Sequence, residues 1–97
     1  MIKIVAVMKV KDGYADTFKA TARELIEKSC AEEGNVFYTL NEMIGVENTL
    51  AFIECWKDQN AIDIHGKTEH FTGIFPKLAA LCEEGSTSAQ VFTEVEY

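Results

Sequence analysis

The stretch Leu50-Ala-Phe-Ile-Glu-Cys-Trp56 has the composition of a buried strand, because aromatic and aliphatic residues fill most of its positions. Side chains alternate along a strand. One face therefore carries Leu50, Phe52, Glu54 and Trp56, and the other carries small and aliphatic side chains. We expect the small and aliphatic face to pack under helices. The other face differs in composition, because it carries a carboxylate between two aromatic side chains.

Three further elements are expected on the N-terminal side of this strand. Ile2–Val10 is rich in β-branched residues and predicts a strand. Apolar residues recur at helical spacing over Tyr14–Glu33, which predicts an amphipathic helix with Gly34 at its C-terminal cap. Asn35–Gly45 alternates as a strand does, and Val46–Thr49 has the residues of a hairpin connection to the strand at 50–56.

On the C-terminal side, the sequence predicts two helices and a last strand. Asp58 and Thr68 are N-cap residues for the two helices. Pro76 conflicts with an uninterrupted second helix, so we expect either a kink or a break near Gly73. Ala89–Tyr97 alternates well enough to form the last strand.

The element order is strand, helix, strand, strand, helices, strand, which is the split βαβ arrangement of an α+β, ferredoxin-like fold. The length of 97 residues suits one domain spanning 1–97. Helices would cover one face of a four-stranded antiparallel sheet. Because 47% of the residues are hydrophobic and six are Phe, the uncovered face is expected to pack on a second copy in a homodimer.

Charge and cysteine content narrow the possible partners. The net charge is −7 and the pI about 4.7, with no basic run, so neither nucleic acid nor an anionic membrane surface is an expected partner. Cys30, Cys55 and Cys82 are dispersed and odd in number, which indicates reduced thiols and a cytoplasmic location. The apolar N-terminal segment is too short to span a bilayer and lacks the features of a leader, so we expect an unprocessed chain.

Three titratable residues are candidates for proton transfer. A desolvated Glu54 would have a raised pKa and act as a base near neutral pH, or it would pair with a cation at a dimer seam. His65 titrates near neutrality and suits proton shuttling, or it hydrogen-bonds carbonyls at a helix end. His70, at the start of the next helix, either contributes to the site or is a partly exposed residue of that helix terminus.

Other side chains are candidates for substrate binding. Trp56 and Phe52 would stack on a flat ligand or belong to the core or an interface. The Tyr38 hydroxyl would contact a substrate oxygen or make a structural hydrogen bond. Asn35 would orient a substrate or form part of a turn.

A metal site is not expected from the sequence. On one continuous helix, His65 and His70 would point about 140° apart. They also lack the spacing of the common two-histidine helical motif, and no third ligand is evident.

One pattern of residues resembles a known family. It consists of Glu54-x-Trp56, Ala61 five residues later, His65 four residues beyond that, and His70-Phe71. This pattern, together with the element order, is similar to the antibiotic-biosynthesis-monooxygenase-like family. The resemblance implies a dimeric α+β barrel with a pocket between sheet and helices in each subunit.

Members of that family include cofactor-independent quinol or phenol oxygenases, haem-degrading enzymes and an isomerase of a phosphorylated signal-breakdown product. The haem degraders carry an Asn on the first strand, and Ile2–Val10 has none, which argues against haem. The favoured hypothesis is a monooxygenase that uses no cofactor. A small quinol or phenol would supply the electrons, Glu54 or His65 the base, and Trp56, Phe52 and Phe71 the apolar wall.

Two alternatives remain open. One is an isomerase that moves protons on a small hydroxyketone, with Tyr38 or His70 polarising the carbonyl group. A phosphorylated hydroxyketone would also need a cationic anchor, for which Lys28, Lys57 and Lys67 are candidates. The other is a dimer that binds a small ligand without catalysis.

Overall fold

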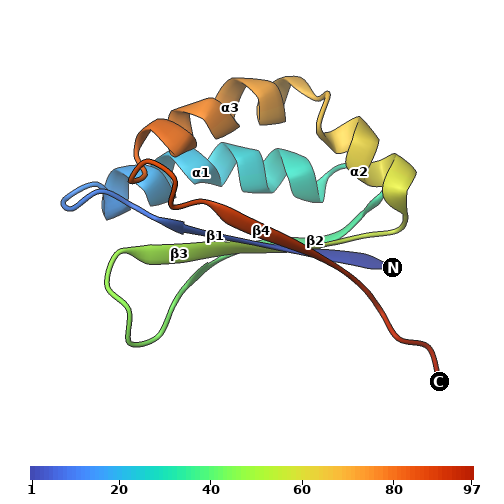
Figure 1. Ribbon diagram of the computed structural model, residues 1–97. Helices are drawn as coiled ribbons and strands as arrows, with labels where there is room; N and C mark the ends of the chain where they lie inside the picture. Colours follow the sequence, from blue (N-terminus) through green and yellow to red (C-terminus); the bar gives the residue numbers. More distant parts are fainter.

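The computed structural model describes residues 1–97, and its elements follow the predicted order. They are β1 (Ile2–Lys9), α1 (Ala15–Cys30), β2 (Asn35–Glu42), β3 (Thr49–Trp56), α2 (Gln59–His65), α3 (Glu69–Ala80) and β4 (Ser88–Thr93). The last strand ends before the predicted Tyr97. It pairs with β1 from Ser88 to Thr93, and the residues that follow extend beyond the sheet (Figure 1).

The four strands form one antiparallel sheet in the order β2-β3-β1-β4. All three helices lie on one face of this sheet, and the other face carries no helix (Figure 1). This arrangement is the ferredoxin-like α+β fold that the sequence predicts. Because β3 and β1 occupy the centre, side chains from the middle of β3 lie under the helices in the best-protected part of the molecule.

The aromatic face of β3 packs under the helices, so the prediction for its two faces was wrong. Phe52 and Trp56 are fully buried, together with Phe18 of α1 and Leu78 of α3. Large rings fill the space between the sheet and its helices, where small side chains would leave voids. Ala51, Ile53 and Cys55 of β3 instead belong to the face without helices.

The helix ends differ in part from the prediction. Asp58 and Thr68 cap α2 and α3 as predicted, accepting hydrogen bonds from the backbone N–H groups of Ala61 and Phe71. The expected break near Gly73 does not occur, and α3 continues through Pro76 to Ala80. Burial of Ile74 and Leu78, on either side of the proline, holds this helix against the core.

Gly34 does not cap α1, which ends at Cys30 with Ala31 as its C-cap. Its backbone lies instead directly against α2, where a Cβ atom at position 34 would collide with the Cβ of Ala61. The Gly34 carbonyl also accepts a hydrogen bond from the Lys57 backbone N–H at 2.9 Å. The glycine is therefore required for close approach between the turn after α1 and the start of the β3–α2 segment.

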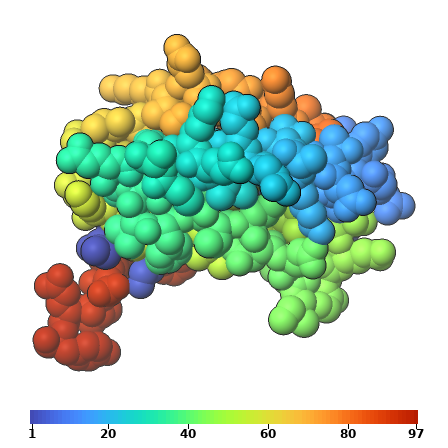
Figure 2. Space-filling view, turned by 180° about the vertical axis from the view of Figure 1, so that it is seen from behind, coloured from blue at the N-terminus to red at the C-terminus, as the bar shows by residue number.

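The sheet face without helices has apolar side chains at its centre among polar ones, and it is flanked by two projections. Val5 of β1 pairs with Ile53 of β3 on this face, and Phe92 of β4 lies one row further along. The loop between β2 and β3 and the segment after β4 both extend past the sheet on this side (Figures 1 and 2). Ile44, in that loop, is 99% exposed.

None of the helices combines the length and the apolar character that crossing a membrane requires.

Replacing Gly34 by Ala tests the close approach. We expect Gly34→Ala to lower the free energy of unfolding by about 1–3 kcal/mol, the usual range for overpacking. Gly73→Ala is the matched control, because a Cβ at that helical position meets no atom within 4 Å. It should raise stability by about 0.5–1 kcal/mol. Urea denaturation measures both, and a Gly34→Ala protein as stable as the wild type would contradict the close approach.

Candidate functional site

Glu54 is a carboxylate in the buried layer between sheet and helices. It lies in the middle of β3, where it pairs with Ile4 of β1 and Tyr38 of β2, and only 6% of it is exposed. Its Oε1 atom accepts a hydrogen bond from the indole Nε1–H of Trp56 at 2.8 Å. The two-residue period of a strand places both side chains on the same face, so this contact is built into β3.

Burial changes the acidity of this carboxyl group. Loss of solvent raises the pKa of Glu54 to about 7, because the charged form is poorly stabilised in an apolar layer. Hydrogen bonding from Trp56 and Tyr38 opposes this shift only in part, and the charge of Glu32 adds to it. Glu54 therefore exchanges protons near neutral pH, as a general base or acid requires.

Aromatic rings surround the site. Trp56 lies edge-on to Tyr38, with ring centroids 6.2 Å apart, and the imidazole of His65 lies 4.5 Å from the Trp56 ring. Phe71 of α3 is 4.8 Å from His65 and stacks on Phe75. Burial also raises the pKa of Tyr38, whose hydroxyl stays protonated. The result is a largely apolar environment around Glu54 and His65.

His65 is the last residue of α2, and its side chain is almost completely buried. Its Nδ1 atom lies 2.6 Å from Oε2 of Glu32, and its Nε2 atom is buried with no hydrogen-bond partner. Burial lowers the pKa of His65, while the Glu32 carboxylate opposes that shift. A neutral imidazole therefore predominates at neutral pH.

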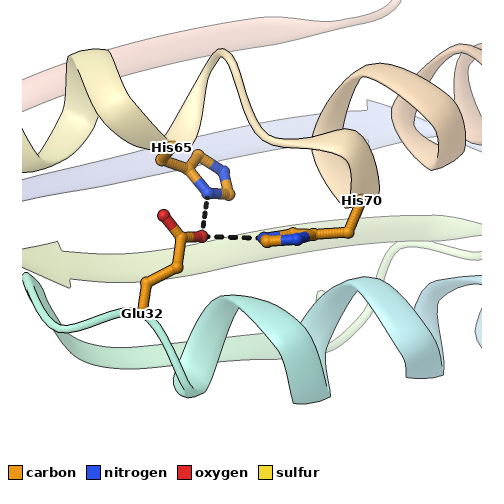
Figure 3. A group of neighbouring side chains, drawn as sticks. All are labelled: Glu32, His65 and His70. Carbon is orange, nitrogen blue, oxygen red and sulfur yellow. Dashed lines mark hydrogen bonds and ion pairs between the residues drawn. The ribbon is translucent and has the colours of Figure 1, made fainter.

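His70 reaches the same carboxylate from the first turn of α3. Its Nε2 atom lies 2.9 Å from Oε2 of Glu32, so both imidazole groups point at one oxygen atom (Figure 3). The Glu32 and His70 side chains are 12% and 13% exposed. His70 was expected either at the site or as an exposed helix-terminal residue, and the structure places it beside His65.

The argument against a metal site was wrong in its geometry. His65 and His70 do not share a helix, because α2 ends at His65 and α3 begins at Glu69. The turn between the helices lets the two rings converge, and Glu32 supplies the third ligand that the sequence did not reveal. One ligand atom from each of the three side chains lies within 4.8 Å of the others, so the cluster could hold a metal ion.

Not every predicted site residue joins this cluster. Phe52 lies deeper in the core, with ring centroids 6.1 Å from Phe18 and 5.5 Å from Tyr38. Asn35 donates from Nδ2 to the backbone carbonyls of Phe37 and Cys55 at the irregular start of β2. These contacts give Asn35 a structural place in the sheet.

An open hollow of about 440 Å³ lies against the outer side of the Glu32 cluster. Glu32 and Thr68 line it together with the turn after α1 and residues of α2. Of the three lysines that were candidates to anchor a phosphate group, only Lys57 lines this hollow. Lys28 pairs with Glu24 on the surface. Because Glu33 and Asp58 accompany Glu32 at this rim, the hollow has an excess of negative charge.

Fold and site together define a ferredoxin-like domain with buried titratable groups between its sheet and helices. Residues 1–77 match the model of the family described as antibiotic biosynthesis monooxygenase. The chain belongs to this family. It is similar to the "Putative monooxygenase YcnE" of Bacillus subtilis (strain 168), with 43% identity over 77 residues, covering 79% of this chain and 81% of that protein.

Solved structures agree with this assignment. A conserved protein from Methanosarcina mazei Go1 superposes with a TM-score of 0.91 at 30% identity, covering 97% of this chain and 92% of that one. A crystal structure described as an antibiotic biosynthesis monooxygenase has a TM-score of 0.90 at 31% identity, covering 99% of this chain and all of the other.

The raised pKa of Glu54 predicts a pH-dependent stability. The carboxyl group titrates near 4.5 when unshifted and near 7 in the folded protein, so between these values only the folded state holds the proton. Stability therefore falls as the pH rises through this window, by roughly 3 kcal/mol. Glu54→Gln removes this pH dependence, because an amide does not titrate. The free energy of unfolding of Glu54→Gln minus that of the wild type should therefore increase by roughly 3 kcal/mol between pH 4.5 and 8.

Urea denaturation across this pH range measures the difference between the two proteins. Glu27→Gln is the control, because Glu27 is exposed on α1 and its replacement should leave the pH profile unchanged. A Glu54→Gln difference that stays constant from pH 4.5 to 8 would contradict the raised pKa.

Proposed function

We propose that the protein is a monooxygenase that oxidises a small quinol or phenol with dioxygen and uses no cofactor. The observation that carries this proposal is Glu54, a carboxyl group with a pKa of about 7 inside an apolar, aromatic-lined layer. Membership of the monooxygenase family supports the reaction class. The aromatic surroundings of Glu54 support a quinol or phenol as the substrate class, because such a flat, electron-rich molecule supplies its own electrons.

A quinol can supply all the electrons that the reaction needs. Removing a hydroxyl proton gives an electron-rich anion, which transfers electrons to dioxygen and forms a bond between a ring carbon and oxygen. One oxygen atom stays on the product as a hydroxyquinone and the other leaves as water. For a quinol, QH₂ and O₂ then yield a hydroxyquinone and H₂O, with four electrons passing from substrate to oxygen.

The site provides the three features that such a reaction requires. Glu54 accepts the hydroxyl proton, because its pKa lies near neutral pH. His65, neutral and buried, accepts a hydrogen bond from the substrate. The rings of Trp56 and Phe71 pack on His65 and keep water away from this part of the layer, so a flat ring that enters beside them would be stacked and its anion shielded from protonation.

An isomerase of a phosphorylated hydroxyketone fits the site less well. Such a substrate needs a cationic anchor. Lys57 borders the hollow beside the site, but three carboxylates, those of Glu32, Glu33 and Asp58, border it too. Their repulsion of a phosphate group favours the neutral quinol as substrate. A ligand-binding dimer without catalysis would leave the raised pKa of Glu54 without a use.

The working unit that we propose is a homodimer formed through the sheet face without helices. Val5 and Ile53 meet in the middle of this face, and no helix covers them (Figure 1). The loop carrying Ile44 and the segment after β4 project beside it, with fully exposed apolar side chains that a second copy would bury.

The three cysteines are free thiols, which favours a reducing compartment such as the cytoplasm.

Dioxygen uptake tests the proposed activity. Purified protein given a reduced naphthoquinol should consume dioxygen above the rate of autoxidation, with EDTA present and no added flavin. Glu54→Gln should lower kcat by at least about 100-fold, the lower range for loss of a general base. In the wild type, kcat/KM should fall as the pH drops through about 7, because Glu54 becomes protonated.

Glu27→Gln is the control, because it makes the same chemical change at an exposed residue. This variant should keep full activity. No uptake above background, or full turnover by Glu54→Gln, would contradict the proposal.

Sedimentation velocity tests the proposed dimer. We expect the wild type to sediment as a dimer and Ile53→Glu as a folded monomer, because the new carboxylate would have to be buried unpaired in the interface. Ile64→Glu makes the same chemical change at an exposed position of α2 and should leave the dimer intact. A monomeric wild type, or a dimeric Ile53→Glu protein, would rule out this interface.

A further inference from the structure

Glu32 holds two histidines that come from different helices. Its Oε2 atom lies within hydrogen-bond distance of Nδ1 of His65 and of Nε2 of His70, at 2.6 and 2.9 Å (Figure 3). No other polar side chain hydrogen-bonds to these two imidazole groups. The two side-chain contacts therefore converge on one carboxylate oxygen.

The positions of the two hydrogens in these contacts follow from simple chemistry. An ionised carboxylate only accepts hydrogen bonds, so each contacting ring nitrogen must carry the hydrogen. His65 then has its proton on Nδ1, and His70 has its proton on Nε2. A neutral His65 in this tautomer has an unprotonated Nε2 atom, which is a hydrogen-bond acceptor.

That acceptor is buried without a partner. Nε2 of His65 makes no hydrogen bond, and the rings of Trp56, Phe71 and Tyr38 surround the imidazole. Leaving a polar atom unsatisfied in such a place costs free energy. A ligand hydroxyl that enters the site would recover this energy by donating to Nε2.

We propose that Glu32 is a positioning residue, which fixes His65 in the Nδ1–H tautomer so that Nε2 accepts a hydrogen bond from the substrate hydroxyl. The identity of that hydroxyl rests on the proposed function, but the tautomer does not. The lowered pKa of His65 supports this assignment, since it keeps the imidazole neutral.

Turn hydrogen bonds hold the backbone on both sides of Glu32. Its N–H donates to the Ser29 carbonyl at 3.1 Å, and its own carbonyl accepts from the Asn35 N–H at 3.0 Å. His65 is held at the other end, where its carbonyl accepts hydrogen bonds from the backbone and the side chain of Thr68. Both partners of the 2.6 Å contact are therefore fixed by turns at helix ends.

The geometry of this cluster favours N–H···O hydrogen bonds from the two imidazole groups to Glu32 over a bound metal ion. In a metal site, the ring nitrogens point at the ion, which lies about 2.0–2.1 Å from each nitrogen. Here both nitrogens point at the carboxylate oxygen itself, at ordinary distances for charge-assisted hydrogen bonds (Figure 3).

Nitrogen-15 NMR of the histidine side chains tests the assignment on the resting protein, without substrate. In the wild type, we expect neutral His65 to show a single tautomer, protonated on Nδ1 and unprotonated on Nε2. Glu32→Ala should abolish this single-tautomer signal. Glu33→Ala is the matched control, since Glu33 is the adjacent, exposed carboxylate, and should leave the signal unchanged.

Glu32→Gln serves as a second variant if Glu32→Ala does not fold, and it too should give mixed tautomers, because an amide both donates and accepts. A wild-type His65 protonated on Nε2, or a tautomer unaffected by either Glu32 variant, would overturn the proposal. So would one equivalent of Zn²⁺ binding to the wild type through both imidazole groups. A fixed tautomer in a protein without dioxygen uptake would refute the proposed monooxygenase activity alone.

Discussion

Burial of the Glu54 carboxyl group is the constraint on which the site depends. A central strand of the sheet carries it into the layer under the helices, where water cannot stabilise its charge. Its one short hydrogen bond, from Trp56, comes from the same strand and the same face, so the pair forms whenever β3 forms. Hydrogen bonding from Trp56 and Tyr38 does not compensate for the lost solvent, and the carboxyl group therefore retains its proton up to about neutral pH.

A second proton-carrying group is assembled around this pair from three other segments. His65 ends α2, His70 lies in the first turn of α3, and Glu32 lies in the turn after α1. Trp56 links the two groups, because it donates to Glu54 and its ring packs on His65. The close contact of Gly34 with Ala61 keeps the turn bearing Glu32 against the helix that ends in His65.

Much of the fold could be predicted from local patterns. Periodicity, cap residues and element order were sufficient for the ferredoxin-like arrangement, and Asp58 and Thr68 cap their helices as expected. The side of β3 that faces the helices was predicted wrongly, since alternation defines two faces but not which one is covered. The face that is covered is the one whose side chains fill the space between the sheet and the helices. The sequence of a single strand does not show how large that space is.

The site could be predicted only where one strand or motif carries it. Glu54 and Trp56 share a face of β3, and that relation is visible in the sequence. Glu32 was missed because it is one of 16 acidic residues and stands in an unremarkable Ala-Glu-Glu-Gly turn. Its significance arises from the turn between α2 and α3, which aims His65 and His70 at one oxygen atom. Long-range convergence of this kind has no local signal.

Isotope labelling with ¹⁸O₂ tests the central claim most directly. If Glu54 deprotonates a quinol that then reacts with dioxygen, the product hydroxyquinone should contain one ¹⁸O atom from ¹⁸O₂ and none from H₂¹⁸O, after correction for solvent exchange. The labelled product should form without metal or flavin. A product oxygen derived from water, or a product formed only when a cofactor is added, would contradict this account.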